Sequence, residues 1–386
     1  MVKIPVIAVN HVKRPGTAEA MLEEGLCDIV FLGRQMMADP EWTNKVATGK
    51  ADQIRYCISC GACIDCSGRG EMLRCSVNPR MSKETLYTDE AFVKNGEGHR
   101  VVVIGGGPAG LEAATLAAKK GFSVDLFEKS AQIGGCFTLP RTAPGMEKMG
   151  WSVDAFIARA VAEGMRIHVN TEIIDPAQIE ELNSYALIMA AGGSPISLKL
   201  PGIERPQVVQ AADVYRNPER YRGKRAIVIG SGFTGLEAAE FLASQGGEVS
   251  IFELDDEIAK RISGDGPIKN KSVLLESLTA RGVKMYPATN TLEIWEKEVL
   301  AENVLTKEQA VYPADLVVQA LGYRPNQSLL ERFAGSAALG TAPALATSLV
   351  PPQRPMRPSG TCKHTCGEVF PPVHLWLVYP QRLSKL

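Results

Sequence analysis

Cysteine is the residue type whose spacing says most about chemistry in this chain. Five of its nine cysteines lie in one short stretch: Cys57, Cys60, Cys63, Cys66 and Cys75. The first four are separated by two residues each, and Cys75 lies nine residues beyond Cys66. Thiolates are soft ligands that hold iron–sulfur clusters or zinc, and four that converge make a complete site. This clustering favours a metal centre over disulfide bonds and leaves both kinds of centre open.

A glycine-rich segment in the first third of the chain predicts a dinucleotide site. Gly105, Gly107 and Gly110 follow the apolar run VVVIG and precede an alanine-rich stretch. In such a turn the first glycine makes the bend and the second lets a pyrophosphate approach the backbone. The third lets the helix pack closely on the strand. Glu128 follows the next expected strand, where its carboxylate can accept hydrogen bonds from ribose hydroxyls.

The same pattern returns with Gly230, Gly232, Gly235 and Glu253. Glu253 would repel a 2′-phosphate, so this second site is expected to prefer NAD over NADP. Two dinucleotide sites in one chain imply hydride transfer between a nicotinamide and a flavin. Beside a flavin a redox cluster is more useful than an inert zinc ion, which makes an iron–sulfur cluster the favoured prediction and zinc the alternative.

The elements expected around these motifs make an α/β protein. Residues 3–9 and 28–33 predict strands joined by a helix over 17–25, the unit from which parallel sheets are built. Residues 57–80, which hold the cysteines, show little periodicity and are expected to form a loop.

Two longer units follow, His99–Ser130 and Lys224–Asp255, and each predicts a strand, a glycine turn, a helix and a second strand. The runs YALIMA (185–190) and ADLVVQALG (314–322) predict further strands before and after the second unit. The second dinucleotide unit is therefore expected to be nested within the domain of the first.

Composition excludes several classes of partner. The formal net charge is −1, which does not suggest binding to nucleic acid or to an acidic membrane surface. No apolar run approaches the roughly 18 residues of a membrane-spanning helix, and the N-terminus does not resemble a signal peptide. We expect a cytoplasmic protein that acts on a small molecule, without a nucleic-acid or membrane partner, and its sequence is compatible with an oligomer.

The paired fingerprints resemble the glutathione-reductase-like flavoproteins with two dinucleotide-binding domains. The resemblance continues in Gly134 and Gly135, in AAGGSP (190–195) and in ALGYRPN (320–326). It implies that the first fingerprint, with Gly134 and Gly135, holds FAD and that the second holds NADH. The chain departs from this pattern at Gly192, where threonine is commoner, and it lacks the Gly-Asp motif that closes the FAD site in that group.

The order of the segments resembles the 2,4-dienoyl-CoA reductase, enoate reductase and trimethylamine dehydrogenase group of the old yellow enzyme family. YCISCGACIDC (56–66) and CSVNP (75–79) are similar to the loop that binds that group's [4Fe-4S] cluster. The resemblance implies four ligands, namely Cys57, Cys60, Cys63 and Cys75. The interval before the third ligand is one residue shorter than in the family, and Cys66 competes for that place.

The segment GRQMMADPEW (33–42) looks like the last strand motif of that family's barrel, in which Gly33 and Arg34 would bind the phosphate of FMN. An eight-stranded barrel needs about 250 residues, so we expect a C-terminal fragment of the parental architecture. The expected fold is α/β: the end of a TIM barrel, an Fe–S cysteine loop, then two nested Rossmann-like FAD and NAD(P) domains. The predicted boundaries are 1–50 for the end of the barrel, 51–95 for the cluster loop, 96–215 for the first part of the FAD domain, 216–312 for the NAD domain, 313–335 for an incomplete return to the FAD domain, and 336–386 for an atypical tail, read as out of frame.

The resemblance implies an NADH-dependent oxidoreductase in which electrons pass through FAD and the cluster to FMN, for reduction of an activated alkene such as an enoate or a dienoyl-CoA. The family's proton donors lie on strands that precede this chain, so no catalytic residue is assigned. Two alternatives stay open: an electron-feeding subunit similar to the small subunit of glutamate synthase, and a non-functional gene remnant. Such subunits carry no barrel end. The composition of the tail favours a remnant, and the intact fingerprints and cysteines indicate that any decay is recent.

Overall fold

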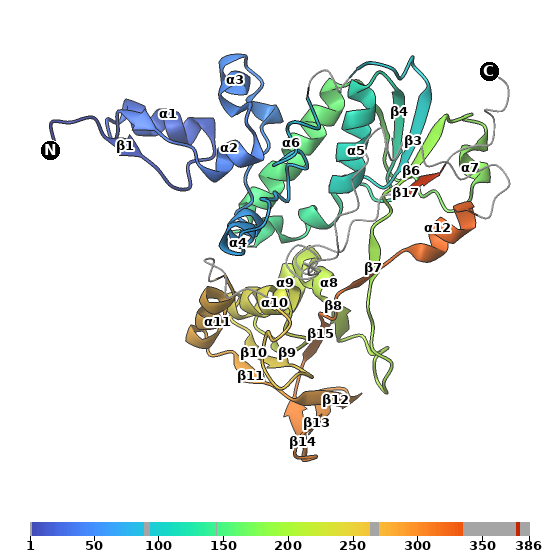
Figure 1. The fold of residues 1–386 in the computed structure, drawn as a ribbon. Helices are drawn as coiled ribbons and strands as arrows, with labels where there is room; N and C mark the ends of the chain where they lie inside the picture. Colours follow the sequence, from blue (N-terminus) through green and yellow to red (C-terminus); the bar gives the residue numbers. More distant parts are fainter. Residues whose placement is uncertain (1, 89–92, 144, 263–269, 335–375, 379–386) are drawn as a thin grey trace.

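A computed structural model describes residues 2–88, 93–143, 145–262, 270–334 and 376–378 (Figure 1). We refer to residues 2–53 as the N-terminal segment and to residues 54–88 as the cysteine segment. The rest of the described chain forms two sheet-based units, called the first and the second unit after the order of their glycine fingerprints. In Figure 1 the N-terminal segment projects to one side of the first unit, and the second unit lies below the first.

The N-terminal segment holds a two-stranded parallel sheet, in which Ile7 is paired with Ile29. Each strand is shorter than predicted, because each has a single neighbour to pair with. Helix α1 joins the strands and begins with Pro15, whose missing N–H is not needed in a first helical turn. The elements are β1 (Ile7–Ala8), α1 (Pro15–Glu23), β2 (Ile29–Val30), α2 (Arg34–Ala38), α3 (Trp42–Ala47) and the 3-10 turn η1 (Ala51–Gln53).

The N-terminal segment has a small core and a large exposed apolar surface. Val12, Ala18, Trp42 and Ile54 are buried together. The exposed apolar side chains lie on and around the two strands and are Val2, Ile4, Val6, Ile7, Val9, Leu22, Leu26, Ile29 and Phe31. Scattered exposed apolar residues are normal, but so many within about thirty residues indicate a surface that is built to be covered.

The cysteine segment contains a short helix, α4 (Ala62–Gly68), which corrects the prediction of a loop over 57–80. Gly61 precedes it with a φ of 81°, a left-handed conformation that glycine adopts without strain. The helix is only two turns long, and its cysteines are not spaced as the apolar residues of an amphipathic helix would be. The hydrophobic periodicity of the sequence therefore did not predict it.

The first unit is a five-stranded sheet in the order β17-β6-β3-β4-β5, in which only β17 runs antiparallel to its neighbour. Its strands are β3 (Arg100–Ile104), β4 (Ser123–Phe127), β5 (Arg166–His168), β6 (Ala186–Met189) and β17 (Trp376–Val378). Its helices and turns are α5 (Pro108–Lys119), η3 (Gly135–Thr138), η4 (Pro140–Thr142), α6 (Glu147–Ala162), α7 (Ala177–Glu180) and α12 (Gln327–Ala334).

Alternation along β3 divides the core of this unit into two layers. Val101 and Val103 pack with residues of α5 and α6, whereas Val102 and Ile104 pack with Ile179 and other residues near α7 and α12. A strand that is apolar at every position is typical of a parallel sheet covered on both faces. This explains why the run VVVI was readable as a buried strand.

The second unit is a parallel sheet in the order β11-β10-β9-β15-β8, with a three-stranded antiparallel sheet, β12-β13-β14, on one of its faces. Its strands are β8 (Val208–Gln210), β9 (Arg225–Ile229), β10 (Glu248–Phe252), β11 (Lys284–Tyr286), β12 (Thr289–Ile294), β13 (Glu298–Asn303), β14 (Gln309–Pro313) and β15 (Leu316–Gln319). Its helices are α8 (Ala211–Arg216), α9 (Pro218–Tyr221), α10 (Phe233–Ser244) and α11 (Asn270–Ala280).

Two strands connect the units. β7 (Gly193–Pro195) leaves the first unit and β16 (Tyr323–Pro325) returns to it, and the two pair antiparallel (Figure 1). The nesting predicted from the two fingerprints is therefore present. Because β8 and β15 pair within the second sheet, the second unit extends beyond the predicted range 216–312 on both sides.

No helix in the described ranges is both long and apolar enough to cross a lipid bilayer. The predicted tail, 336–386, lies outside the described residues except for β17. Of that segment, Trp376–Val378 pair with Leu187–Met189 at the edge of the first sheet.

Candidate functional site

The first glycine fingerprint forms the turn between β3 and α5. A Cβ on Gly105 would lie 2.3 Å from the carbonyl oxygen of Ala190, and one on Gly110 would lie 1.9 Å from that of Gly105. Neither space admits a side chain, so both glycines are required for the strand and helix to approach. At Gly107 the nearest atom is 3.9 Å away, which leaves its backbone open toward a ligand. This is the arrangement that accepts a pyrophosphate at a helix N-terminus.

Glu128 is held against this turn. Its Oε2 accepts a hydrogen bond from the N–H of Gly106 at 2.8 Å, and its Oε1 accepts one from the N–H of Ser130 at 2.8 Å. Only 8% of the residue is exposed. Each carboxylate oxygen keeps a further lone pair, so a fixed acceptor stands beside the loop where the ribose of a dinucleotide would lie.

Gly134 and Gly135 form the opposite wall of the same loop. The Gly134 N–H donates to the carbonyl oxygen of Gly106 at 2.8 Å, and both glycines have positive φ, 118° and 55°. A Cβ on Gly135 would lie 3.0 Å from the Cα of Gly107. Two chain segments separated in sequence thus meet through glycines, and the residues present fit an FAD at this position.

The second fingerprint repeats the first almost atom for atom. A Cβ on Gly230 would lie 2.7 Å from the carbonyl oxygen of Ala320, and one on Gly235 would lie 2.0 Å from that of Gly230. Gly232 has open space around it. Glu253 accepts from the N–H of Ser231 at 2.8 Å.

The second acidic residue has one donor more than the first. The Ser231 hydroxyl donates to Glu253 Oε2 at 2.5 Å, and the N–H of Asp255 donates to Oε1 at 2.9 Å. The two nearby cations, Lys260 and Arg261, are paired with Asp256 and Asp255 respectively. The surroundings of this carboxylate therefore suit the neutral ribose of NADH.

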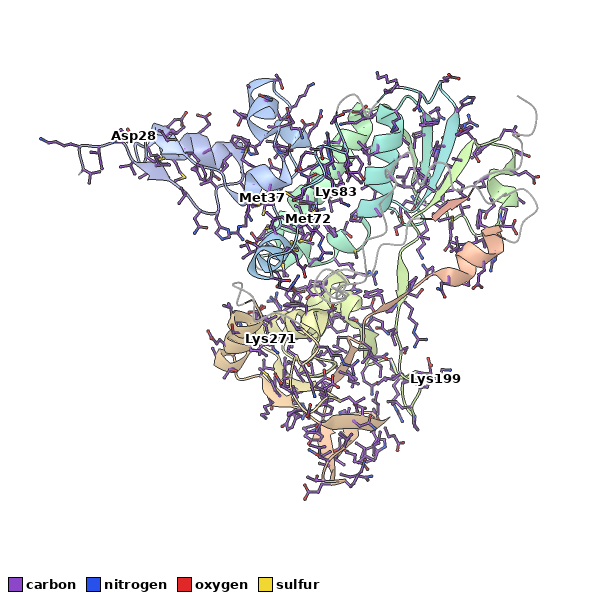
Figure 2. The ribbon with its side chains drawn as sticks, in the orientation of Figure 1. Asp28, Met37, Met72, Lys83, Lys199 and Lys271 are labelled. Carbon is purple, nitrogen blue, oxygen red and sulfur yellow. The ribbon has the colours of Figure 1, made fainter. Side chains whose placement is uncertain are left out.

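The cysteine segment is anchored at both ends to its surroundings. Gln35 of α2 accepts from the N–H of Cys57 at 3.0 Å and donates to the carbonyl oxygen of Arg55 at 2.8 Å. At the other end, Asn78 donates to the carbonyl oxygen of Met37 at 2.9 Å. Met37 is labelled in Figure 2, where the N-terminal segment approaches the first unit.

A buried ion-pair network joins this segment to the helix of the first fingerprint. Arg55 makes two hydrogen bonds to Glu112 of α5, at 2.6 and 2.9 Å, and a third to the carbonyl oxygen of Val77 at 2.8 Å. Arg159 of α6 approaches Glu112 at 3.2 Å. Burial would raise the pKa of Glu112, but the two guanidinium groups outweigh it and hold the pKa below its ordinary value.

Four of the five clustered cysteines share one electrostatic neighbourhood. The pKa of Cys63 is raised by burial and by the charges of Cys60 and Cys57. The pKa of Cys75 is raised by burial to about 11, with the N–H groups of Val77 and Asn78 donating to its sulfur and acting in the opposite direction. Cys60 also lies 3.1 Å from the Ser76 hydroxyl.

Cys66 differs from these four. It lies one turn beyond Cys63 on α4, roughly 4.5 Å further along the helix axis, and is only 2% exposed. Neither the raised pKa of Cys63 nor that of Cys75 has Cys66 among its main causes. Cys63 is the better placed of the two for a site shared with Cys57, Cys60 and Cys75.

In the described part of the chain, no three side chains of His, Cys, Asp or Glu are close enough to hold a single metal ion. Four thiols in one neighbourhood, two of them approached by backbone N–H donors, are a donor set that fits an iron–sulfur cluster.

The predicted phosphate-binding pair lies beside the cysteine segment. Gly33 precedes α2, and Arg34 is its first residue. Burial lowers the pKa of His11, and the charges of Lys13 and Arg34 lower it further. Several cations therefore gather on this side of the cysteines, as an anionic group would require.

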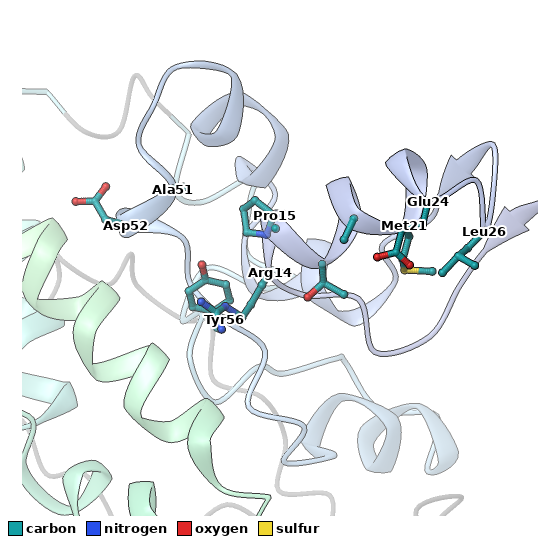
Figure 3. A pocket seen from close by; sticks show the side chains of 11 residues that line it. Arg14, Pro15, Met21, Glu24, Leu26, Ala51, Asp52 and Tyr56 are labelled. Atoms are coloured by element: carbon teal, nitrogen blue, oxygen red, sulfur yellow. The ribbon is translucent and has the colours of Figure 1, made fainter.

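A pocket of about 700 Å³ lies elsewhere on the N-terminal segment, between α1 and Tyr56 (Figure 3). Arg14, Met21 and Asp52 contribute to its lining. The Arg14 guanidinium lies over the ring of Trp151 at 5.2 Å. The pocket contains none of the predicted cofactor residues, so it does not identify a substrate site.

Two known families match consecutive parts of the chain. Residues 99–342 match the pyridine nucleotide-disulphide oxidoreductase family. The chain belongs to that family. Residues 1–53 match the NADH:flavin oxidoreductase / NADH oxidase family, which confirms the resemblance drawn from the segment order, and the predicted class of oxidoreductase is confirmed with it.

Several known proteins are similar to the chain over most of its length. Bilirubin reductase of Mediterraneibacter gnavus is 36% identical over 329 residues, which are 84% of this chain and 49% of the relative. NADH oxidase of Thermoanaerobacter brockii is 34% identical over 84% of this chain and 50% of its own length. A solved structure of 2-naphthoyl-CoA reductase with 2-naphthoyl-CoA has a TM-score of 0.77 and 28% identity, covering 86% of this chain and 49% of that one. The chain thus spans about half the length of these relatives.

Several residues that join these segments were not found from the sequence. Glu112 and Arg55 are 57 residues apart, and Glu112 and Arg159 are 47 apart, so no local spacing connects them. Gln35 lies in GRQMMADPEW, directly after Gly33 and Arg34. That position in the motif was the one feature of the sequence that could have indicated a role for Gln35.

Proposed function

We propose that this chain is the electron-transfer portion of an NADH-dependent flavin and iron–sulfur oxidoreductase. The observation that carries the proposal is the Arg55–Glu112 pair. It fastens the cysteine segment to α5, the helix that begins at the first dinucleotide loop. A redox cluster is thereby held beside a flavin site by a contact that buries both charges.

We propose Gly105, Gly107, Gly110, Glu128 and the Gly134–Gly135 pair as the FAD site. When bound, FAD would supply the acceptor for a hydride from NADH, and a [4Fe-4S] cluster would supply one-electron transfer toward FMN. In this chain the fixed carboxylate of Glu128 orients a ribose, and the bare glycines let the pyrophosphate reach the helix N-terminus.

For the second site we propose NADH as ligand, held by Gly230, Gly232, Gly235 and Glu253. A 2′-phosphate would meet a carboxylate whose nearby cations are paired with Asp255 and Asp256. NADH avoids that repulsion, which supports a preference for NAD over NADP.

The N-terminal segment is proposed as the end of an FMN-binding barrel, with Gly33 and Arg34 at the phosphate. Its exposed apolar strands and its match to the NADH:flavin oxidoreductase family support this. That match also disfavours an electron-feeding subunit of the glutamate synthase kind. Reduction of an activated alkene by the whole enzyme is the proposed reaction, and the similarity to bilirubin reductase and 2-naphthoyl-CoA reductase supports a reductase.

The proposal is tested by purifying the 386-residue chain without oxygen and measuring flavin, iron and sulfide together with the absorbance spectrum. We expect bound FAD and about four iron atoms per chain, with the spectrum bleached by NADH. A chain without iron after reconstitution would exclude the cluster, and a chain without flavin would exclude the FAD site.

Cys63→Ala and Cys66→Ala form a matched pair for the ligand assignment, because both thiols lie on α4 one turn apart. Cys63→Ala is expected to lose the iron, whereas Cys66→Ala keeps it. The reverse result would show that the third ligand is Cys66. Retention of all iron in both variants would contradict the ligand set.

A further inference from the structure

A lysine of the N-terminal segment reaches into the cysteine segment. The backbone of Lys13 is fixed, because its carbonyl oxygen accepts a hydrogen bond from the indole N–H of Trp42 at 2.8 Å and the adjacent Val12 is buried. Its side chain is half-buried and its Nζ donates to the hydroxyl of Ser59 at 2.6 Å. Ser59 lies between Cys57 and Cys60 in the sequence.

The backbone conformation of Ser59 accompanies its contact with Lys13. Ser59 has a φ of 56°, a left-handed conformation that a non-glycine residue adopts only where its surroundings hold it. The ammonium group of Lys13 supplies part of that restraint. It thereby stands next to the turn that carries the first two proposed cluster ligands.

Among the residues that the structure describes, no carboxylate forms an ion pair with Lys13. Burial lowers the pKa of Lys13, the charges of Cys57 and Cys60 raise it, and those of Lys148 and Arg34 lower it. Lys45 of α3 provides the contrast, because it pairs with Asp39 at 2.6 Å. The ammonium group of Lys13 therefore acts on Cys57 and Cys60 without a carboxylate partner in the described part of the chain.

We propose that Lys13 is a positioning residue whose fixed charge raises the reduction potential of the cluster held by Cys57, Cys60, Cys63 and Cys75. Reduction adds one electron to a cluster that already carries negative thiolates. A nearby cation stabilises the reduced state more than the oxidised state, and it does so strongly where water is partly excluded. The inference rests on the proposed function, since it requires a cluster at these cysteines.

The test is a redox titration of the full chain, followed by the electron paramagnetic resonance signal of the reduced cluster. Lys13→Met removes the charge and keeps the length of the side chain. We expect a tenfold shift toward the oxidised cluster in the one-electron equilibrium, about 59 mV to lower potential. Lys13→Arg should keep the wild-type potential, and Lys50→Met, which removes an exposed lysine charge, should leave it unchanged.

The iron content of each variant separates the role of charge from that of structure. A Lys13→Met chain that holds its full iron at an unchanged potential would overturn the inference. If that variant loses iron, Lys13→Gln provides the second test, because its amide can still donate to Ser59 while the charge is gone. An unchanged potential there would also overturn it. A wild-type chain that holds no cluster would overturn the proposed function, and the inference with it, before any variant is compared.

Discussion

Glu112 is expected to hold the cysteine segment and the first fingerprint helix together. Its side chain is 12% exposed, and those of Arg55 and Arg159 are 13% and 7% exposed. Glu112→Gln replaces one carboxylate oxygen, a hydrogen-bond acceptor, with an amide NH2 group. The N–H groups of that amide then face a guanidinium, which can only donate. Two buried guanidinium groups then lose the carboxylate that they contact directly. Breaking a buried ion pair from one side typically costs about 3–5 kcal/mol.

The effect should be local, so we would measure hydrogen–deuterium exchange with peptide resolution. At about 3 kcal/mol the opening equilibrium rises by over a hundredfold, since each 1.4 kcal/mol is a factor of about ten. Peptides that cover the cysteine segment and α5 should exchange faster by that factor. Peptides of β9 and α10 in the second unit should not change.

The matched control is Glu219→Gln, the same substitution in an exposed pair with Arg222 at 2.6 Å. Glu219 is 74% exposed and Arg222 is 57% exposed, and such pairs contribute less than about 1 kcal/mol. If Glu112→Gln changed exchange in the cysteine segment by less than tenfold, as the control is expected to do, the network would not hold the two parts together. A loss of iron in Glu112→Gln would be the expected functional consequence.

The same network predicts how stability depends on pH. The lowered pKa of Glu112 means that its contribution is present above the ordinary pKa of a glutamate and is lost as the pH falls through the lowered value. Glu112→Gln should abolish this part of the dependence. Exchange rates of the cysteine segment that respond to acid equally in both proteins would contradict this.

Three further predictions concern single sites. Gly110→Ala should abolish FAD binding, because its Cβ would lie 1.9 Å from the Gly105 oxygen, and a stoichiometric flavin content after reconstitution would contradict this. Arg166 holds the pKa of Asp125 below its ordinary value, so Asp125→Asn should lower the thermal midpoint near pH 7. The difference from wild type should shrink as the pH falls through the lowered pKa, and a constant difference would refute the assignment. Glu253→Gln should raise the KM for NADH about tenfold, the loss of one charge-assisted hydrogen bond, with less effect on kcat. An unchanged ratio of activities with NADH and NADPH, measured with an artificial electron acceptor, would show that Glu253 does not select the nucleotide.

The sequence alone determined the features that depend on neighbouring residues. A strand followed by three glycines at fixed intervals forms its turn and helix through local backbone geometry, and both fingerprints fold as predicted. The clustering of cysteines likewise predicted a metal centre without knowledge of the fold, and that centre stays a prediction. The apolar runs of β3 and β9 were readable because both faces of their sheets are covered.

Only the tertiary structure decided the features that depend on contacts between residues far apart in the sequence. Strands β8 and β15 joined the second sheet because their hydrogen-bond partners lie on β9 and on each other, which no local period reports. The contrast between Cys63 and Cys66 arises because α4 carries them one turn apart, into different surroundings. The contacts of Glu112 and Lys13 join segments that are 57 and 46 residues apart, and a charge finds its partner there only after the chain has folded.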